Sequence, residues 1–366
     1  MIFLLMTILL SGHLVAVNLA AAAPLVCVWL GWQSEDLSGR IGRQLAWIAF
    51  CALPIGVFLG FALGGLYRFE ESSKYWEMLS RFPARAYVVV LLELTFSLVC
   101  LFIYALTWER LKQHRWVHAL FACLATTNLL YHFPPLMSAM SLLVDRPELI
   151  LEETITRRLL RPVLMNPAVI SLSVHFALAS LAVSGVVLMV LGLRFGESGR
   201  KIVASGARIA LVPTLLQLVV GVWVVMEIPV GVRNSLMGND LLTAVMFGLS
   251  LFSVFGLMLV LAGISLGQCD TAAVCRAVVL MGVIVLLMVG ILVRSRHLSK
   301  EGIVKGGSAR TTGATPVERE SEDVLQPGVV RRICLSRPMV SEPLSAHAIA
   351  FVGTTKKTAA TEWQQF

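Results

Sequence analysis

Eight long apolar stretches, separated mostly by short polar segments, dominate this sequence. Each is comparable to the roughly 20 helical residues that cross a hydrocarbon core about 30 Å thick. Their approximate limits are 1–32, 44–66, 86–107, 116–143, 167–193, 209–230, 241–267 and 277–294. Backbone groups in hydrocarbon must find their hydrogen bonds inside the segment, which helices achieve. The sequence therefore predicts an all-α, polytopic membrane helix bundle over residues 1–295, with about eight transmembrane helices.

The composition supports a protein that lives in a lipid bilayer. Hydrophobic residues make up 57% of the chain, charged residues only 14%, and the mean hydropathy is +0.81. The formal net charge of +8 is spread over loops and tail without a basic face. It favours contact with anionic lipid headgroups and gives no indication of nucleic-acid binding.

Two segments differ from the apolar runs. From residue 296 to 366, Gly, Ser, Thr, Pro and charges of both signs dominate, as in KGGSARTTGATPVERESEDV (305–324), which predicts a polar, disordered tail. Between the fourth and fifth runs, ELILEETITRRLLRP (148–162) mixes apolar and charged residues at helical spacing. That pattern fits a helix along the membrane interface or an ordinary solvated connector.

Several polar residues interrupt the apolar runs at similar depths. If the spans alternate in direction and rise 1.5 Å per residue, one half of the membrane contains six of them. These are His13, Glu93, His132, His175, Met226 and Glu227. Charged groups at this depth cost about 2.5–3.5 kcal/mol each, so they normally face a partner or a cofactor.

Neutral imidazole and thioether groups are axial ligands of haem iron, and helical bundles build such sites from facing helices. The chain has seven cysteines but no CxxCH motif, which excludes a covalently attached c-type haem by motif. His118 lies near the opposite interface, beside His114, where a solvated histidine is expected. Each residue alone also has a simpler interpretation: an interhelical hydrogen bond for a histidine, packing for a methionine.

Three sequence matches give these residues a family context. Asn166-Pro167, followed by Val174-His175 and the small-residue run 177–180, resembles a helix whose histidine ligates a low-spin haem b. The runs ELTF (93–96) and WERL (108–111) resemble an E-S-T-F helix and the W-D-R-L loop after it. Over most of spans one to six, the chain thus resembles subunit I of the cytochrome bd quinol oxidases. His13 occupies the place of the family's histidine associated with the oxygen-reacting haem pair.

The resemblance implies a haem-binding membrane cytochrome with one or more b-type haems. His175 would hold the low-spin haem, with Met226 as a candidate second ligand by depth alone, and His13 and His132 would serve a second haem. Glu93 would act as a proton relay or as an acid beside a haem, and Arg85, near the membrane surface, would pair with a haem propionate. The expected setting is a hetero-oligomeric respiratory complex of the bacterial cytoplasmic membrane, with quinol or another electron-transfer subunit as partner.

Departures from the family leave the activity open. Arg85 stands where the family has a second glutamate, and the long quinol-binding loop after the sixth helix is missing. Passing electrons to another chain therefore fits the residues as well as quinol oxidation does, so whether the chain is an oxidoreductase is undecided. Two alternatives also remain: a transporter or channel with a polar site in one leaflet, and a haem-free structural membrane subunit.

Overall fold

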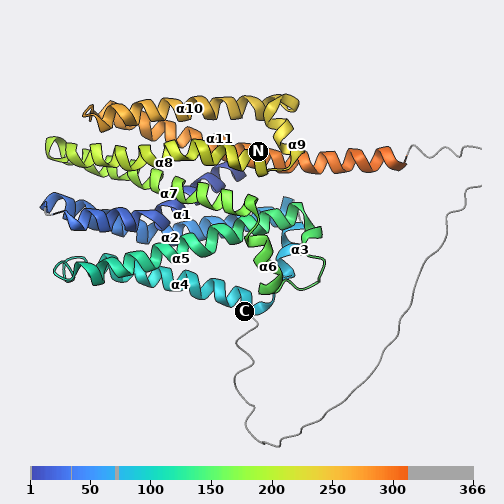
Figure 1. The fold of residues 1–366 in the computed structure, drawn as a ribbon, viewed down its shortest axis with the longest axis horizontal. Helices are drawn as coiled ribbons and strands as arrows, with labels where there is room; N and C mark the ends of the chain where they lie inside the picture. The colour runs from blue at the N-terminus through green and yellow to red at the C-terminus, as the bar shows by residue number, and fades with distance from the viewer. Residues whose placement is uncertain (1, 34, 71–73, 312–366) are drawn as a thin grey trace, which may run out of the picture. The chain divides into compact units, whose positions relative to one another are not determined.

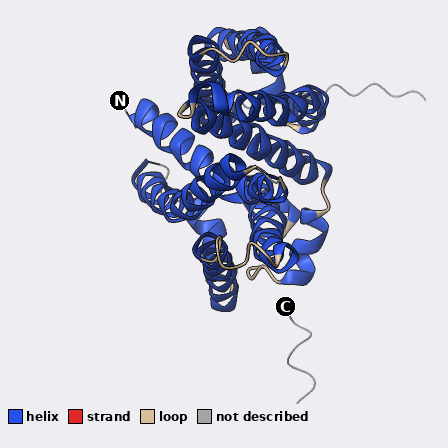
Figure 2. Ribbon diagram, turned by 90° about the vertical axis from the view of Figure 1, so that its left-hand side faces the viewer, coloured by secondary structure: helices blue, strands red, loops and turns tan. Residues whose placement is uncertain are grey.

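The computed structural model describes residues 2–33, 35–70 and 74–311, and every regular element in this part is helical (Figure 2). The long helices are α1 (Ile2–Trp32), α2 (Asp36–Glu70), α4 (Ala84–Leu106), α5 (Arg115–Asp145), α7 (Pro167–Leu193), α8 (Arg200–Glu227), α10 (Leu241–Ser265) and α11 (Thr271–Thr311). Short helical elements connect them: α3 (Lys74–Ser80), η1 (Pro147–Leu149), α6 (Arg157–Leu164), η2 (Gly196–Gly199), α9 (Val230–Asn234) and η3 (Ser235–Asn239). The predicted all-α class is confirmed.

Seven of the long helices in this part are long and apolar enough to cross a membrane, and only α5 is not among them. At 31 residues α5 is as long as α1, but Thr126, Asn128 and His132 together with two prolines lower its hydropathy. It nevertheless packs against α1, α4 and α7 within the bundle. The chain is therefore an integral membrane protein, and the eight predicted spans correspond to eight long helices.

The long helices alternate in direction, so α1, α4, α7 and α10 run the same way (Figure 1). The α1–α2, α4–α5, α7–α8 and α10–α11 connections therefore share one end of the bundle, which we call the hairpin end. The connections at the opposite end contain α3, α6 and α9. Helix α1 packs against α2, α5 and α7, so it connects the α7–α8 pair with α2 and α5.

Small residues bring α7 and α8 into close contact. A Cβ atom added to Gly185 would lie 2.6 Å from the amide nitrogen of Ala210 and 2.7 Å from the carbonyl oxygen of Gly206. Only a glycine at 185 leaves room for this approach, which lets backbones pack where lipid provides no hydrophobic driving force.

The start of α7 and the end of α11 show how the long helices begin and end. Asn166 caps α7: its Oδ1 accepts a hydrogen bond from the amide of Ala168 at 2.9 Å, and Pro167 occupies the first turn. Helix α11, however, continues past residue 295 to Thr311, although Gly302, Gly306 and Gly307 in this stretch disfavour a helix. Residues 303–311 belong to a second unit, and the rest of the predicted tail, 312–366, lies outside the described residues.

The connector between α5 and α7 contains a short amphipathic helix, α6. Its apolar side chains, including the buried Val163, join a cluster with Met140 and Leu143 of α5, while Arg157 and Arg158 are exposed. The helix covers only residues 157–162 of the segment 148–162, and its apolar side faces α5, so the interfacial helix and the solvated connector both remain open.

Candidate functional site

His13 of α1 is held by a carbonyl group of the neighbouring helix. Its Nδ1 lies 2.7 Å from the carbonyl oxygen of Gly56 in α2. A carbonyl oxygen only accepts, so Nδ1 carries the proton and Nε2 of a neutral ring keeps its lone pair. One turn further along α2, a Cβ on Gly60 would lie 3.0 Å from the ring carbon Cε1, so the glycine makes room for the imidazole. Histidines that ligate metals commonly donate their second nitrogen to a carbonyl in this way.

His175 of α7 is in the opposite situation, because its Nδ1 is buried and has no hydrogen-bond partner in the described part of the chain. The neighbouring helix α8 reaches only the backbone of this residue: Nε2 of Gln217 donates to the His175 carbonyl oxygen at 3.4 Å. A buried polar atom without a partner costs about 1–3 kcal/mol. Within the described residues, this ring nitrogen of His175 is therefore buried and unsatisfied, as are Nε1 of Trp76 and Oγ1 of Thr126.

A hydrogen bond between α1 and α7 sets the relative height of these two histidines. The hydroxyl of Ser180 donates to Oδ1 of Asn18 at 2.7 Å, and both side chains are buried. His13 precedes Asn18 by five residues, and His175 precedes Ser180 by five, on helices that run in the same direction. Each histidine therefore lies about 7.5 Å from the hydrogen bond, on the same side of it. The structure places both at one level of the bundle.

A second polar contact fixes α4 against α5. Nδ2 of Asn128 donates to the Glu93 carbonyl oxygen at 2.7 Å and to the hydroxyl of Ser97 at 2.8 Å. Glu93 precedes Ser97 by four residues and His132 follows Asn128 by four on the antiparallel helix, so both are displaced by about 6 Å in the same direction. Glu93 is half-buried, but His132 is exposed on the outside of α5, with its ring against Tyr131 at 5.1 Å.

Met226 and Arg85 lie away from these histidines. Met226 follows Gln217, the residue beside His175, by nine residues of α8, which corresponds to about 13.5 Å along the helix. Its side chain is 66% exposed. Arg85 is exposed at the start of α4. The structure therefore does not bring Met226 to the level of His175.

The described residues contain no group of three or more His, Cys, Asp or Glu side chains that could hold a metal ion. A haem requires only one or two protein ligands, so this finding does not bear on a haem. An apolar groove of about 630 Å³ lies between α1, α2 and α11. None of its lining residues is a histidine or a methionine, so it is not built around the predicted ligands.

His118 corrects the sequence interpretation of a solvated side chain. Its Nε2 lies 2.8 Å from the carbonyl oxygen of Tyr104, and its ring stacks on the Tyr104 ring at 4.1 Å. Helix α4 ends at Leu106, which leaves carbonyl groups of its last turn without helical partners. His118 from α5 caps one of them and is half-buried as a result. The buried pairs formed by Asn18, Ser97, Asn128 and Ser180 were also not anticipated, although polar residues inside apolar runs were the available signal.

No known protein-family model matches this chain, and no curated protein matches it either. The resemblance to bd oxidase subunit I therefore depends on the motifs around His13, Glu93 and His175 alone.

Proposed function

We propose that this protein is a haem-binding membrane cytochrome that carries electrons within a membrane complex. The observation that supports this best is that two imidazoles, those of His13 and His175, lie at the same height in an apolar helix bundle. Nε2 of His13 keeps its lone pair, and Nδ1 of His175 is buried without a partner among the residues that the structure describes. The first feature is expected of a histidine that ligates a metal, and the second leaves a buried nitrogen that a bound group could satisfy.

In this proposal His175 is the ligand of one b-type haem and His13 the ligand of a second. The haem, when bound, supplies one-electron oxidation and reduction. The Gly56 carbonyl holds His13 in the tautomer that presents Nε2, and the Asn18–Ser180 hydrogen bond keeps the two histidine-bearing helices in register. Met226 and His132 are left out of the ligand set, because the first is displaced along α8 and the second is exposed.

Glu93 has the role of a proton-holding group beside this level. It is half-buried in α4, and a carboxyl at such depth exchanges protons where water is scarce. Arg85, exposed at the end of the same helix, is a candidate partner for a haem propionate. Quinol, or another electron-transfer subunit of a hetero-oligomeric complex, is the proposed source or recipient of electrons.

The haem-free structural subunit is the main competitor, because the Asn18–Ser180 and Asn128–Ser97 contacts are also what interhelical hydrogen bonding produces. His175 favours the haem-binding alternative, because its buried Nδ1 has no hydrogen-bond partner among the described residues. A transporter would likewise give a colourless preparation.

The test is the reduced-minus-oxidised absorption spectrum of the purified protein and of single-histidine variants. His175→Ala should lose the bands of the haem that it holds, and His13→Ala should lose a separate set. His118→Ala is the matched control, since it removes a half-buried histidine near the start of α5, at the hairpin end, and should leave the bands in place. Equal loss in His118→Ala and His175→Ala, or unchanged bands in His175→Ala, would contradict the assignment.

A further inference from the structure

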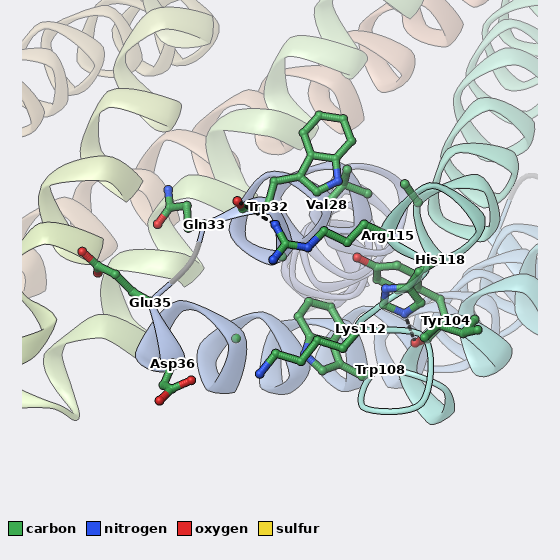
Figure 3. A pocket seen from close by; sticks show the side chains of 14 residues that line it. Val28, Trp32, Gln33, Glu35, Asp36, Tyr104, Trp108, Lys112, Arg115 and His118 are labelled. Carbon is green, nitrogen blue, oxygen red and sulfur yellow. Dashed lines mark hydrogen bonds between the residues drawn. The ribbon is translucent and has the colours of Figure 1, made fainter.

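A second hollow, of about 60 Å³, lies at the hairpin end of the bundle (Figure 3). Its walls come from the end of α1, the start of α2, the end of α4 and the start of α5. Because membrane-spanning helices end here, the pocket lies at the level of the lipid headgroups. Its size suits a compact polar group and not a large ligand.

The pocket is lined by two cations and two anions, which come from different connections. Lys112 and Arg115 belong to the α4–α5 side, and Glu35 and Asp36 to the α1–α2 side. Figure 3 shows the two carboxylates on one side of the hollow and the two basic side chains on the other. A pocket with balanced and separated charges favours a ligand that itself carries one charge of each sign.

Existing contacts leave these side chains available. Arg115 donates from Nη1 to the Trp32 carbonyl oxygen at 3.3 Å, which orients its guanidinium without neutralising it. Glu35 lies 3.2 Å from Nζ of Lys201, in an ion pair whose side chains are 49% and 83% exposed, so it is weak.

Aromatic side chains form the remaining wall. Trp108 is 5% exposed and packs edge-on against the rings of Tyr104 and His118. Trp32 is 47% exposed and contacts Trp116, with ring centroids 5.1 Å apart. Tryptophan and tyrosine are enriched where helices leave the hydrocarbon, because their rings suit the boundary between apolar chains and polar headgroups.

We propose that this pocket binds the headgroup of a phospholipid of the phosphatidylethanolamine type. Lys112 and Arg115 receive the phosphate, and Glu35 and Asp36 receive the ammonium group. An ammonium offers three N–H donors to carboxylates, whereas a quaternary choline offers none. An anionic headgroup would meet the two carboxylates without a compensating cation. This site is separate from the proposed haem ligands and does not depend on them.

The test is native mass spectrometry of the full-length protein in detergent with equimolar phosphatidylethanolamine, phosphatidylcholine and phosphatidylglycerol of identical acyl chains. Wild-type protein should retain phosphatidylethanolamine about three- to tenfold more than either competitor, as expected for a few partly exposed charge-assisted contacts. Glu35→Gln with Asp36→Asn should remove the preference over phosphatidylcholine and raise phosphatidylglycerol binding. Lys112→Gln with Arg115→Gln should weaken all three.

The control is Arg43→Gln with Glu109→Gln. This exposed pair, 3.8 Å apart, lies at the same end but does not line the pocket, so its loss should leave the preference unchanged. Equal retention of the three lipids by wild-type protein would overturn the proposal, as would an equal effect in the control. Displacement of the bound lipid by soluble phosphoethanolamine at the same concentration would show that the lipid is not the ligand.

Discussion

Helices α4 and α7 have the same mean hydropathy, 2.4, over their most apolar stretches, yet they occupy different surroundings. Of that stretch, 56% is buried in α7 and only 17% in α4. Helix α7 places small residues such as Ser180, Ser184 and Gly185 against its neighbours, whereas α4 presents Leu92 and Phe96 to the outside. Apolarity therefore does not decide which helix lies at the centre of a bundle in lipid. Small residues and polar contacts do.

The largest expected effect comes from enlarging the closest contact of α7. Gly185→Leu should destabilise the protein by about 3 kcal/mol or prevent folding, since the new side chain would meet backbone atoms of α8 that cannot move aside. Leu92→Ala in α4 is the comparison, because this side chain is 63% exposed and should change stability by less than about 0.5 kcal/mol. Thermal unfolding in detergent measures both. Equal effects would mean that α7 is not the central helix.

A smaller effect is expected from the hydroxyl groups of the same two helices. Ser180 donates to Asn18 of another helix, whereas Thr95 of α4 donates only to the Leu91 carbonyl of its own helix, at 2.8 Å. A double-mutant cycle with Asn18→Ala and Ser180→Ala should give a coupling of about 0.6 kcal/mol, and at most about 1.7. Thr95→Val should have almost no effect on unfolding. A coupling of zero would show that this hydrogen bond does not set the register of α1 against α7.

The smallest effect on stability is expected from the ion pair between Asp240, at the start of α10, and Arg294 of α11. The Arg294 guanidinium, 3.2 Å from Asp240, and then the Thr243 hydroxyl lower the pKa of the Asp240 carboxyl from 3.8 to about 2. The ionised Asp240 carboxylate therefore stabilises the folded protein fully above about pH 4, and this stabilisation is lost as the pH falls toward 2. Asp240→Asn should lower the melting temperature slightly near neutral pH and flatten its dependence on pH in the acid range. An unchanged acid profile would show that this contact does not stabilise the α10–α11 edge.

The bilayer made the fold predictable. Eight apolar runs of membrane length became eight long helices, because hydrocarbon leaves a backbone little alternative. Helix ends were less predictable. Helix α2 begins at Asp36 and not near residue 44, since polar residues outside the hydrocarbon can continue a helix without penalty.

The sequence predicted how deep the candidate residues lie in the membrane, but not which way their side chains face. Estimating 1.5 Å per residue placed His13 and His175 at similar heights, and the Asn18–Ser180 contact agrees with that. It could not show that His132 faces outward or that Met226 is far from His175 along α8. A helix that is apolar on all sides carries no signal for which face turns inward. Such information resides in contacts between helices, as with His118 and Tyr104.

The most direct measurement is the pyridine haemochrome assay of the folded, purified wild-type protein, which gives the haem type and its amount per chain. The account predicts b-type haem at about two equivalents per chain, one for His175 and one for His13. A folded protein without haem at any stoichiometry would contradict it, and would leave His13 and His175 as residues that serve helix packing alone.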